Sequence, residues 1–148
     1  MVDLSVKSLM RSRQRVLGAL VLWLVALGLM VFSPTSGRPS GIVKEWCDFL
    51  RSLGASGELV AFRPWEVAFN VAMFIPVGFL TPLVLPVRGW GRWLVIGLCS
   101  GGFVELVQAF VLPHRVAEWS DVVANGGGML LGYLIAGWLR MVRARAVR

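Results

Sequence analysis

Two polar side chains lie within an apolar stretch of the chain that is long enough to cross a lipid bilayer. Glu105 and Gln108 interrupt the run GGFVELVQAFVLPH, residues 101–114, and their i, i+3 spacing puts both on one face of a helix. A charge at this depth costs roughly 2.5–3.5 kcal/mol on insertion scales. We therefore expect Glu105 to face a bundle interior, where it finds a partner or stays protonated and can act as a general acid or base.

Four further polar residues fall at a similar expected depth on neighbouring apolar stretches. Asn70 lies about one turn into the stretch 67–85, while Asp121 and Asn125 are i, i+4 neighbours around the start of the stretch 122–139. The fourth is Arg115, which lies between the third and fourth apolar stretches. Three helices would then bring carboxyl, amide and guanidinium groups to one side of the membrane, as a site for a polar ligand requires. The predicted ligand-binding residues are Asn70, Glu105, Gln108, Arg115, Asp121 and Asn125.

The elements that would position these residues are predicted from composition. The 148 residues are 57% hydrophobic, with a mean hydropathy of +0.73, which identifies a small integral membrane protein. We predict a single all-α domain, 1–148, with four transmembrane helices in an antiparallel bundle. A spanning helix needs about 20 apolar residues, and the predicted spans are 16–32, 67–85, 93–112 and 122–139. The first, which follows several basic residues, also resembles a cleavable signal peptide.

Basic residues set the expected orientation, because Lys and Arg accumulate in short cytoplasmic loops. With four spans and an internal N-terminus, ten of the 15 basic residues fall on the cytoplasmic side. Both termini should then be cytoplasmic, and the polar cluster should face outward. Positive loops against anionic lipid account for the net charge of +7, so we expect no nucleic-acid partner. The ten residues are Lys7, Arg11, Arg13, Arg15, Arg88, Arg92, Arg140, Arg143, Arg145 and Arg148.

The loop between the first two spans carries an amphipathic pattern of its own. Apolar residues recur there at helical spacing, so we predict a short helix in the outer interface of the membrane. Its apolar positions are Ile42, Trp46, Phe49, Leu50 and Leu53. Tryptophans near the ends of the spans predict an aromatic belt at each boundary. They are Trp65 and Trp119 on the outer side and Trp90, Trp93 and Trp138 on the inner side.

Small residues predict where the helices approach one another. Gly128 and Gly132 repeat at the spacing that lets a neighbouring backbone come close. Pro76 and Gly78 should interrupt or bend the second span and free the carbonyl of Ala72 for a hydrogen bond into the polar cluster. Consecutive spans joined by short loops should be antiparallel neighbours.

The same residues resemble the successive signatures of the VanZ-like membrane protein family. NVAMFIPVGF (70–79) looks like N-x-x-x-F-x-P-x-G-F, and ELVQ (105–108) looks like E-x-x-Q. RVAEWSDVVANGGGMLLG (115–132) looks like R followed by D-x-x-x-N-x-x-G-x-x-x-G. The resemblance covers residues 66–139. Its matching positions are Asn70, Phe74, Pro76, Gly78, Glu105, Gln108, Arg115, Asp121, Asn125, Gly128 and Gly132.

The resemblance implies a multi-pass protein of the bacterial cytoplasmic membrane. It also implies a role at the cell envelope in low-level resistance to glycopeptide antibiotics such as teicoplanin. The family has no settled biochemical activity, so the function has to be argued from the residues. The resemblance leaves the first span and the loop up to Pro64 unassigned.

Several functions fit these residues, and we favour binding. The outward-facing cluster would hold a lipid head group, a lipid-linked envelope intermediate or a lipophilic antibiotic, with Arg115 meeting phosphate or carboxylate. An enzyme on an envelope substrate would use Glu105 as acid or base, with His114 or Asp121 as proton partner. A structural or assembly subunit would use the amides as hydrogen bonds between helices.

A proton-coupled transporter is a further alternative, for which four spans are few unless the protein oligomerises. A homo-oligomer or a membrane partner protein is compatible with the glycines. The positions that match the family motifs include no Ser or Cys that could act as a nucleophile, the motifs contain no phosphate-binding loop, and the chain has a single histidine. We therefore expect no metal and no cofactor.

Overall fold

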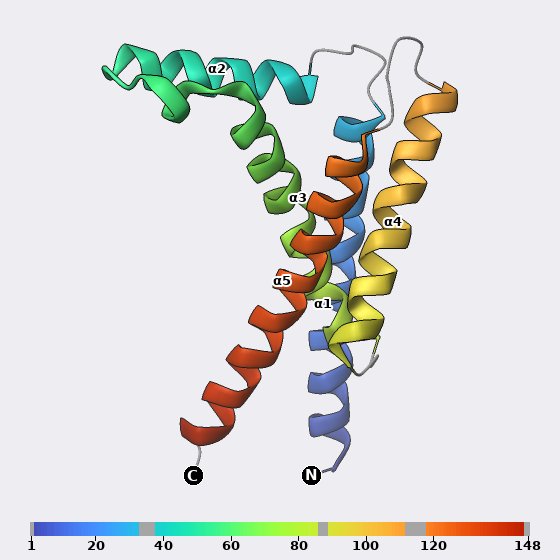
Figure 1. Ribbon diagram of the computed structural model, residues 1–148. Helices are drawn as coiled ribbons and strands as arrows, with labels where there is room; N and C mark the ends of the chain where they lie inside the picture. The colour runs from blue at the N-terminus through green and yellow to red at the C-terminus, as the bar shows by residue number, and fades with distance from the viewer. Residues whose placement is uncertain (1, 33–37, 86–88, 112–117, 147–148) are drawn as a thin grey trace.

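The computed structural model describes residues 2–32, 38–85, 89–111 and 118–146, which are helical apart from short turns and contain no strand (Figure 1). Four of its helices are long and apolar enough to cross a membrane, as predicted. In chain order the elements are α1 (Val2–Val31), α2 (Arg38–Ser52), the 3-10 helix η1 (Gly57–Val60), α3 (Phe62–Val84), α4 (Trp90–Val111) and α5 (Trp119–Ala146).

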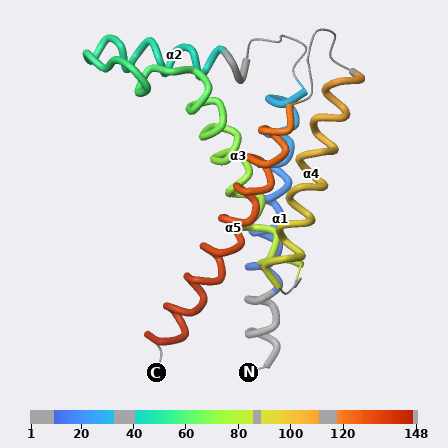
Figure 2. Tube along the Cα trace, viewed as in Figure 1, coloured from blue at the N-terminus to red at the C-terminus, as the bar shows by residue number. Residues whose placement is uncertain are grey.

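The long helices α1, α3, α4 and α5 form one antiparallel bundle, and α2 lies across one end of it (Figures 1 and 2). We call that end the loop end. Helix α1 begins and α5 finishes at the opposite end, which we call the terminal end. The two ends of the chain therefore lie on the same side of the bundle, as four spans require. That this side is cytoplasmic stays a prediction.

Helix α5 is the centre of the bundle, because it packs against both α3 and α4. The consecutive helices α3 and α4 pack mainly against α5 rather than against each other, so the prediction that they are direct neighbours is wrong. The reason lies in the glycines of α5. Gly126 and Gly128 are two residues apart, which places them on opposite sides of a helix with 3.6 residues per turn. Each side can therefore receive a different neighbour.

The contact between α3 and α5 is a backbone contact, as the glycines predicted. A Cβ on Gly128 would lie 2.2 Å from the carbonyl oxygen of Val71, and a Cβ on Gly132 would lie 2.1 Å from that of Ile75. A Cβ on Gly78 would lie 1.9 Å from the carbonyl oxygen of Met129. These positions admit no side chain without moving the helices apart. Figure 1 shows α3 and α5 crossing in the middle of the bundle.

Helix α3 continues through its prolines without interruption. It contains both Pro76 and Pro82 and is helical from Phe62 to Val84. Ala72, whose carbonyl loses its helical partner to Pro76, is exposed and does not line the polar cavity described below. The predicted interruption of the helix is therefore wrong, and Gly78 instead lies at a close approach to α5 that was not predicted for it.

The contact between α4 and α5 also depends on small residues, which the sequence analysis did not single out. A Cβ on Gly97 would lie 3.0 Å from the Cα of Gly126. Trp93, one turn earlier on the same face of α4, stacks on Tyr133 with ring centroids 5.4 Å apart. Because Trp93 is only 1% exposed, its assignment to the aromatic belt was wrong, whereas Trp90 is exposed.

Helix α1 lies at the edge of the bundle and turns much of its apolar surface outward. Leu22, Val25 and Leu29 are exposed, whereas Leu20 and Val31 are buried. Exposed apolar surface on this scale is unfavourable in water and is suited to contact with lipid. The four apolar helices identify the chain as a membrane protein.

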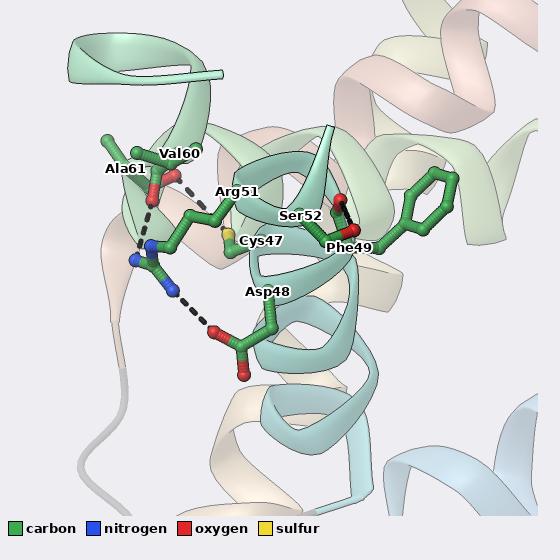
Figure 3. A network of polar contacts seen from close by, with 7 residues as sticks. All are labelled: Cys47, Asp48, Phe49, Arg51, Ser52, Val60 and Ala61. Carbon is green, nitrogen blue, oxygen red and sulfur yellow. Dashed lines mark hydrogen bonds and ion pairs between the residues drawn. The ribbon is translucent and has the colours of Figure 1, made fainter. Parts of the chain in front are cut away.

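Helix α2 lies in the loop for which an amphipathic helix was predicted, and the residues that it buries differ from the predicted apolar positions. Val43 and Cys47 are buried, whereas the predicted apolar positions Ile42 and Phe49 are exposed. Figure 3 shows how the end of α2 is fixed: the Arg51 guanidinium donates to Asp48 and, at 3.2 Å, to the carbonyl of Val60 in η1. A location in the outer membrane interface stays a prediction.

Candidate functional site

The polar residues predicted on α3, α4 and α5 surround one small cavity near the loop end. We call it the polar cavity, and its volume of about 20 Å³ has room for one water-sized group. Five of the six predicted ligand-binding residues line it, and the sixth, Arg115, lies outside the described residues, as does His114. The polar lining is Asn70, Glu105, Gln108, Asp121 and Asn125, and the apolar lining is Val31, Met73, Phe74 and Val104.

Glu105 connects α4 to the beginning of α5. Its side chain is 6% exposed, and Oε2 accepts a hydrogen bond of 2.9 Å from the backbone N–H of Glu118. Glu118 directly precedes α5, and its carbonyl accepts the N–H of Asp121 in the first turn of that helix. The carboxyl group therefore accepts one of the N–H groups at the start of α5, which have no partner within that helix.

Gln108 connects α4 to the end of α1. It is 7% exposed, and its Nε2 donates a hydrogen bond of 2.9 Å to the carbonyl oxygen of Val31. Val31 is the last residue of α1, so this carbonyl has no partner within its own helix. The first span thereby becomes part of the site. The residue types in that span gave no signal for this role, because the contact is made by a backbone atom.

Asn125 has an unused hydrogen-bond acceptor. It is 4% exposed, and its buried Oδ1 has no donor among the described residues. Leaving a buried polar atom without a partner costs about 1–3 kcal/mol, so such an atom calls for an explanation. Because Asn125 lines the polar cavity, the space beside it can receive one group that donates a hydrogen bond.

A second cavity continues the polar cavity toward α2. It has a volume of about 40 Å³, and Asn70, Met73 and Asp121 line both cavities. Glu66 adds a carboxyl group to it, while residues of α2 cover it. Glu66 was not among the predicted ligand-binding residues. Its i, i+4 spacing from Asn70 could have placed it on the same face of α3.

An ion pair at the loop end joins α3 to the beginning of α5. Arg63 pairs with Glu118 and, at 3.7 Å, with Glu66. The hydrogen bond from Arg63 lowers the pKa of Glu118 below its ordinary value, the charge of Arg63 acts in the same direction, and the Ser120 hydroxyl adds a further hydrogen bond. Glu118 therefore binds α3 through the ion pair of its side chain with Arg63, and α4 through the hydrogen bond of its N–H to Glu105.

Most of the predicted structural residues lie in the contact between α3 and α5, next to this site. Phe74 is buried between the polar cavity and Gly128 of α5, whose Cβ would lie 3.1 Å from the Cβ of Phe74. Gly78 and Gly132 lie about one turn further along the same contact. Within the described parts of the chain, no group of three or more His, Cys, Asp or Glu residues is arranged to hold a metal ion.

Comparison with known protein families gave one match. The sequence model of a family described as VanZ/LLP1 matches residues 16–140, which is more than half of the chain. The match includes the second half of α1 and all of α2, whereas the motifs in the sequence covered only residues 66–139. Comparison with curated proteins and with solved structures gave no match.

Proposed function

The chain belongs to the VanZ/LLP1 family, and on that premise we propose that its polar cavity binds the head group of a lipid or lipid-linked intermediate of the bacterial cell envelope. The observation that carries the proposal is the buried Oδ1 of Asn125. It has no donor among the described residues and lies beside a cavity lined by polar groups from three helices. We place the protein in the cytoplasmic membrane with its loop end outward, as the distribution of basic residues favours.

The size of the two cavities restricts the ligand. Volumes of about 20 Å³ and 40 Å³ admit single water-sized groups. A head group therefore inserts one hydroxyl, amine or amide, while the rest of it lies at the loop end. The body of a glycopeptide antibiotic is far too large to enter, so we favour a lipid over the antibiotic. A contribution to glycopeptide resistance would then act through the bound lipid.

The chemistry of the lining restricts the inserted group as well. The free acceptor on Asn125 needs a donor, and the carboxyl groups of Glu105 and Asp121 accept hydrogen bonds as well. A ligand hydroxyl or N–H group supplies the donor that the Oδ1 of Asn125 does not find among the described residues. Arg115, which follows α4 in the chain, is the residue we assign to a head-group phosphate.

A structural role is the second candidate, and two specific bonds favour it. Glu105 holds the start of α5 through the Glu118 N–H, and Gln108 holds the end of α1 through the Val31 carbonyl. Hydrogen bonds of this kind between membrane helices contribute about 0.6–2 kcal/mol each. In this case the network would fix the packing of a subunit that docks to another membrane protein.

Native mass spectrometry of the gently extracted protein separates the two candidates. The wild type is compared with Glu105→Gln, Arg115→Ala and the control Glu45→Gln, which changes an exposed carboxyl on α2. The amide oxygen of Glu105→Gln can still accept the Glu118 N–H, so this variant should fold. We expect a bound lipid in the wild type and the control and its loss from both site variants. A wild type without bound lipid, with all variants folded, would favour the structural role.

A further inference from the structure

An apolar groove along α1 and α4 meets the polar cavity. Its volume is about 410 Å³, within the range of ligand pockets, and its residues come from α1, α3 and α4. Val31, Phe74 and Val104 line both the groove and the polar cavity. The apolar space therefore ends where the polar lining begins, as in a site for an amphiphile.

We propose that this groove holds one acyl chain of a membrane phospholipid whose head group contacts the polar cavity. The proposal rests on the proposed function and names the class of ligand. A phospholipid bound in this way is held at both ends, by hydrogen bonds at Asn125 and by apolar contact along α1 and α4. A polyisoprenoid carrier has a chain several times longer than an acyl chain, so a groove of this volume suits the phospholipid better.

Small residues line part of the groove. Gly28 of α1 lines one side, and a Cβ there would meet no atom within 4 Å. Cys99 and Ser100 of α4 line it as well, while the buried side chains of Phe74 and Val77 belong to α3. Large side chains at the small positions would fill the space with protein, and their absence leaves room for a hydrocarbon chain.

A bond between the two helices at the loop end favours an acyl chain over a helix of a partner protein. The hydrogen bond from Gln108 to the Val31 carbonyl joins α4 to α1 there. A helix could therefore not enter between α1 and α4 without breaking that bond.

Two phenylalanine variants on α1 test the proposal by native mass spectrometry of the full chain. Gly28→Phe places a ring in the groove, whereas Gly18→Phe adds the same ring to an exposed part of α1 that does not line the groove. A Cβ at either position meets no atom within 4 Å, so both variants should fold. We expect at least tenfold less bound phospholipid in Gly28→Phe and an unchanged amount in Gly18→Phe.

Labelling of Cys99 gives an independent measurement. Cys99 is exposed in the groove, and Cys47 is buried on α2, so a small maleimide should label only Cys99 in detergent. Adding mixed micelles of phosphatidylethanolamine and phosphatidylglycerol to the delipidated wild type should slow this labelling severalfold. The same addition should have no effect on Gly28→Phe. Equal labelling rates with and without phospholipid would overturn the proposal.

The outcomes also separate this proposal from the proposed function. Lipid that persists in Gly28→Phe but is lost from Glu105→Gln would leave the head-group site standing and overturn the acyl-chain groove. A bound mass that corresponds to a polyisoprenoid, or a second protein chain released by Gly28→Phe, would overturn it as well. Lipid retained equally by all variants would overturn both proposals.

Discussion

Adding one methyl group to Gly128 should separate the two helices that carry Asn70 and Asn125. In Gly128→Ala the new Cβ would lie 2.2 Å from the carbonyl oxygen of Val71, whereas ordinary van der Waals contact begins at 3.4 Å. The obstacle is the backbone of α3, which cannot rotate away as a side chain can. Helices α3 and α5 must therefore move apart by more than 1 Å.

The size of the effect follows from comparison with the adjacent residue. Overpacking a close contact costs typically about 1–3 kcal/mol, and a backbone obstacle places Gly128→Ala at the upper end of that range. Gly127 is exposed, and a Cβ there meets no atom within 4 Å. Gly127→Ala should therefore stabilise the helix by about 0.5–1 kcal/mol. The two variants should differ by about 3.5–4 kcal/mol in unfolding free energy, with opposite signs relative to the wild type.

The assay is reversible unfolding of the purified protein in mixed detergent micelles, followed by tryptophan fluorescence. Lipid binding, measured on the same samples, should fall in Gly128→Ala because the wall of the polar cavity has moved. Equal unfolding free energies of the two variants, within about 0.5 kcal/mol, would show that the approach of α3 to α5 is not as close as we describe. Our account of how the site is positioned would then be wrong.

Three other predictions address different contacts. Gln108→Leu removes the hydrogen bond to the Val31 carbonyl. Hydrogen exchange at the end of α1 should therefore accelerate, and the unfolding free energy should fall by about 0.5–1.5 kcal/mol. An unchanged exchange rate would argue against this hydrogen bond. Because the pKa of Glu118 is lowered in the folded protein, its ion pair with Arg63 stabilises above the unfolded pKa and is lost as the pH falls through the folded pKa. The difference in Tm between wild type and Arg63→Ala should therefore be largest near neutral pH and shrink in acid, and a pH-independent difference would assign it to another cause. Trp93→Ala empties a buried position that stacks on Tyr133 and should cost about 3–5 kcal/mol, whereas Trp90→Ala, at an exposed position, should cost less than about 0.5 kcal/mol in the same unfolding assay.

The spans could be predicted because hydropathy indicates which segments are apolar enough to cross the hydrocarbon core of a bilayer. It does not report where a helix ends: α3 begins at Phe62 rather than 67, and α5 continues to Ala146 rather than 139. Helical hydrogen bonds continue through charged residues, whereas an apolar stretch stops at them. The central position of α5 was missed because it depends on Gly126 facing α4, and we singled out only the glycines that face α3.

The side chains of the site were more predictable than their partners. Their similar depth along three predicted spans placed Asn70, Glu105 and Asn125 at one level of the membrane, and the structure brings them together around the polar cavity. Their actual contacts include the N–H of Glu118 and the carbonyl of Val31. Every residue has the same backbone groups, so the residue types do not show which of these groups will bind a side chain. Only the positions of the helix ends show which N–H and carbonyl groups have no partner within their helix.

Substitution of Asn125 by leucine, which branches at the same carbon, is the most direct test of a ligand site in the polar cavity. Both bound lipid and the unfolding free energy of the delipidated protein would be measured. The Oδ1 of Asn125 has no donor among the described residues. Its removal should therefore leave the unfolding free energy unchanged or raised by up to about 1–3 kcal/mol, while bound lipid falls at least tenfold. Unchanged lipid binding together with a clear loss of stability would show that Asn125 holds the helices together, and it would contradict the binding site.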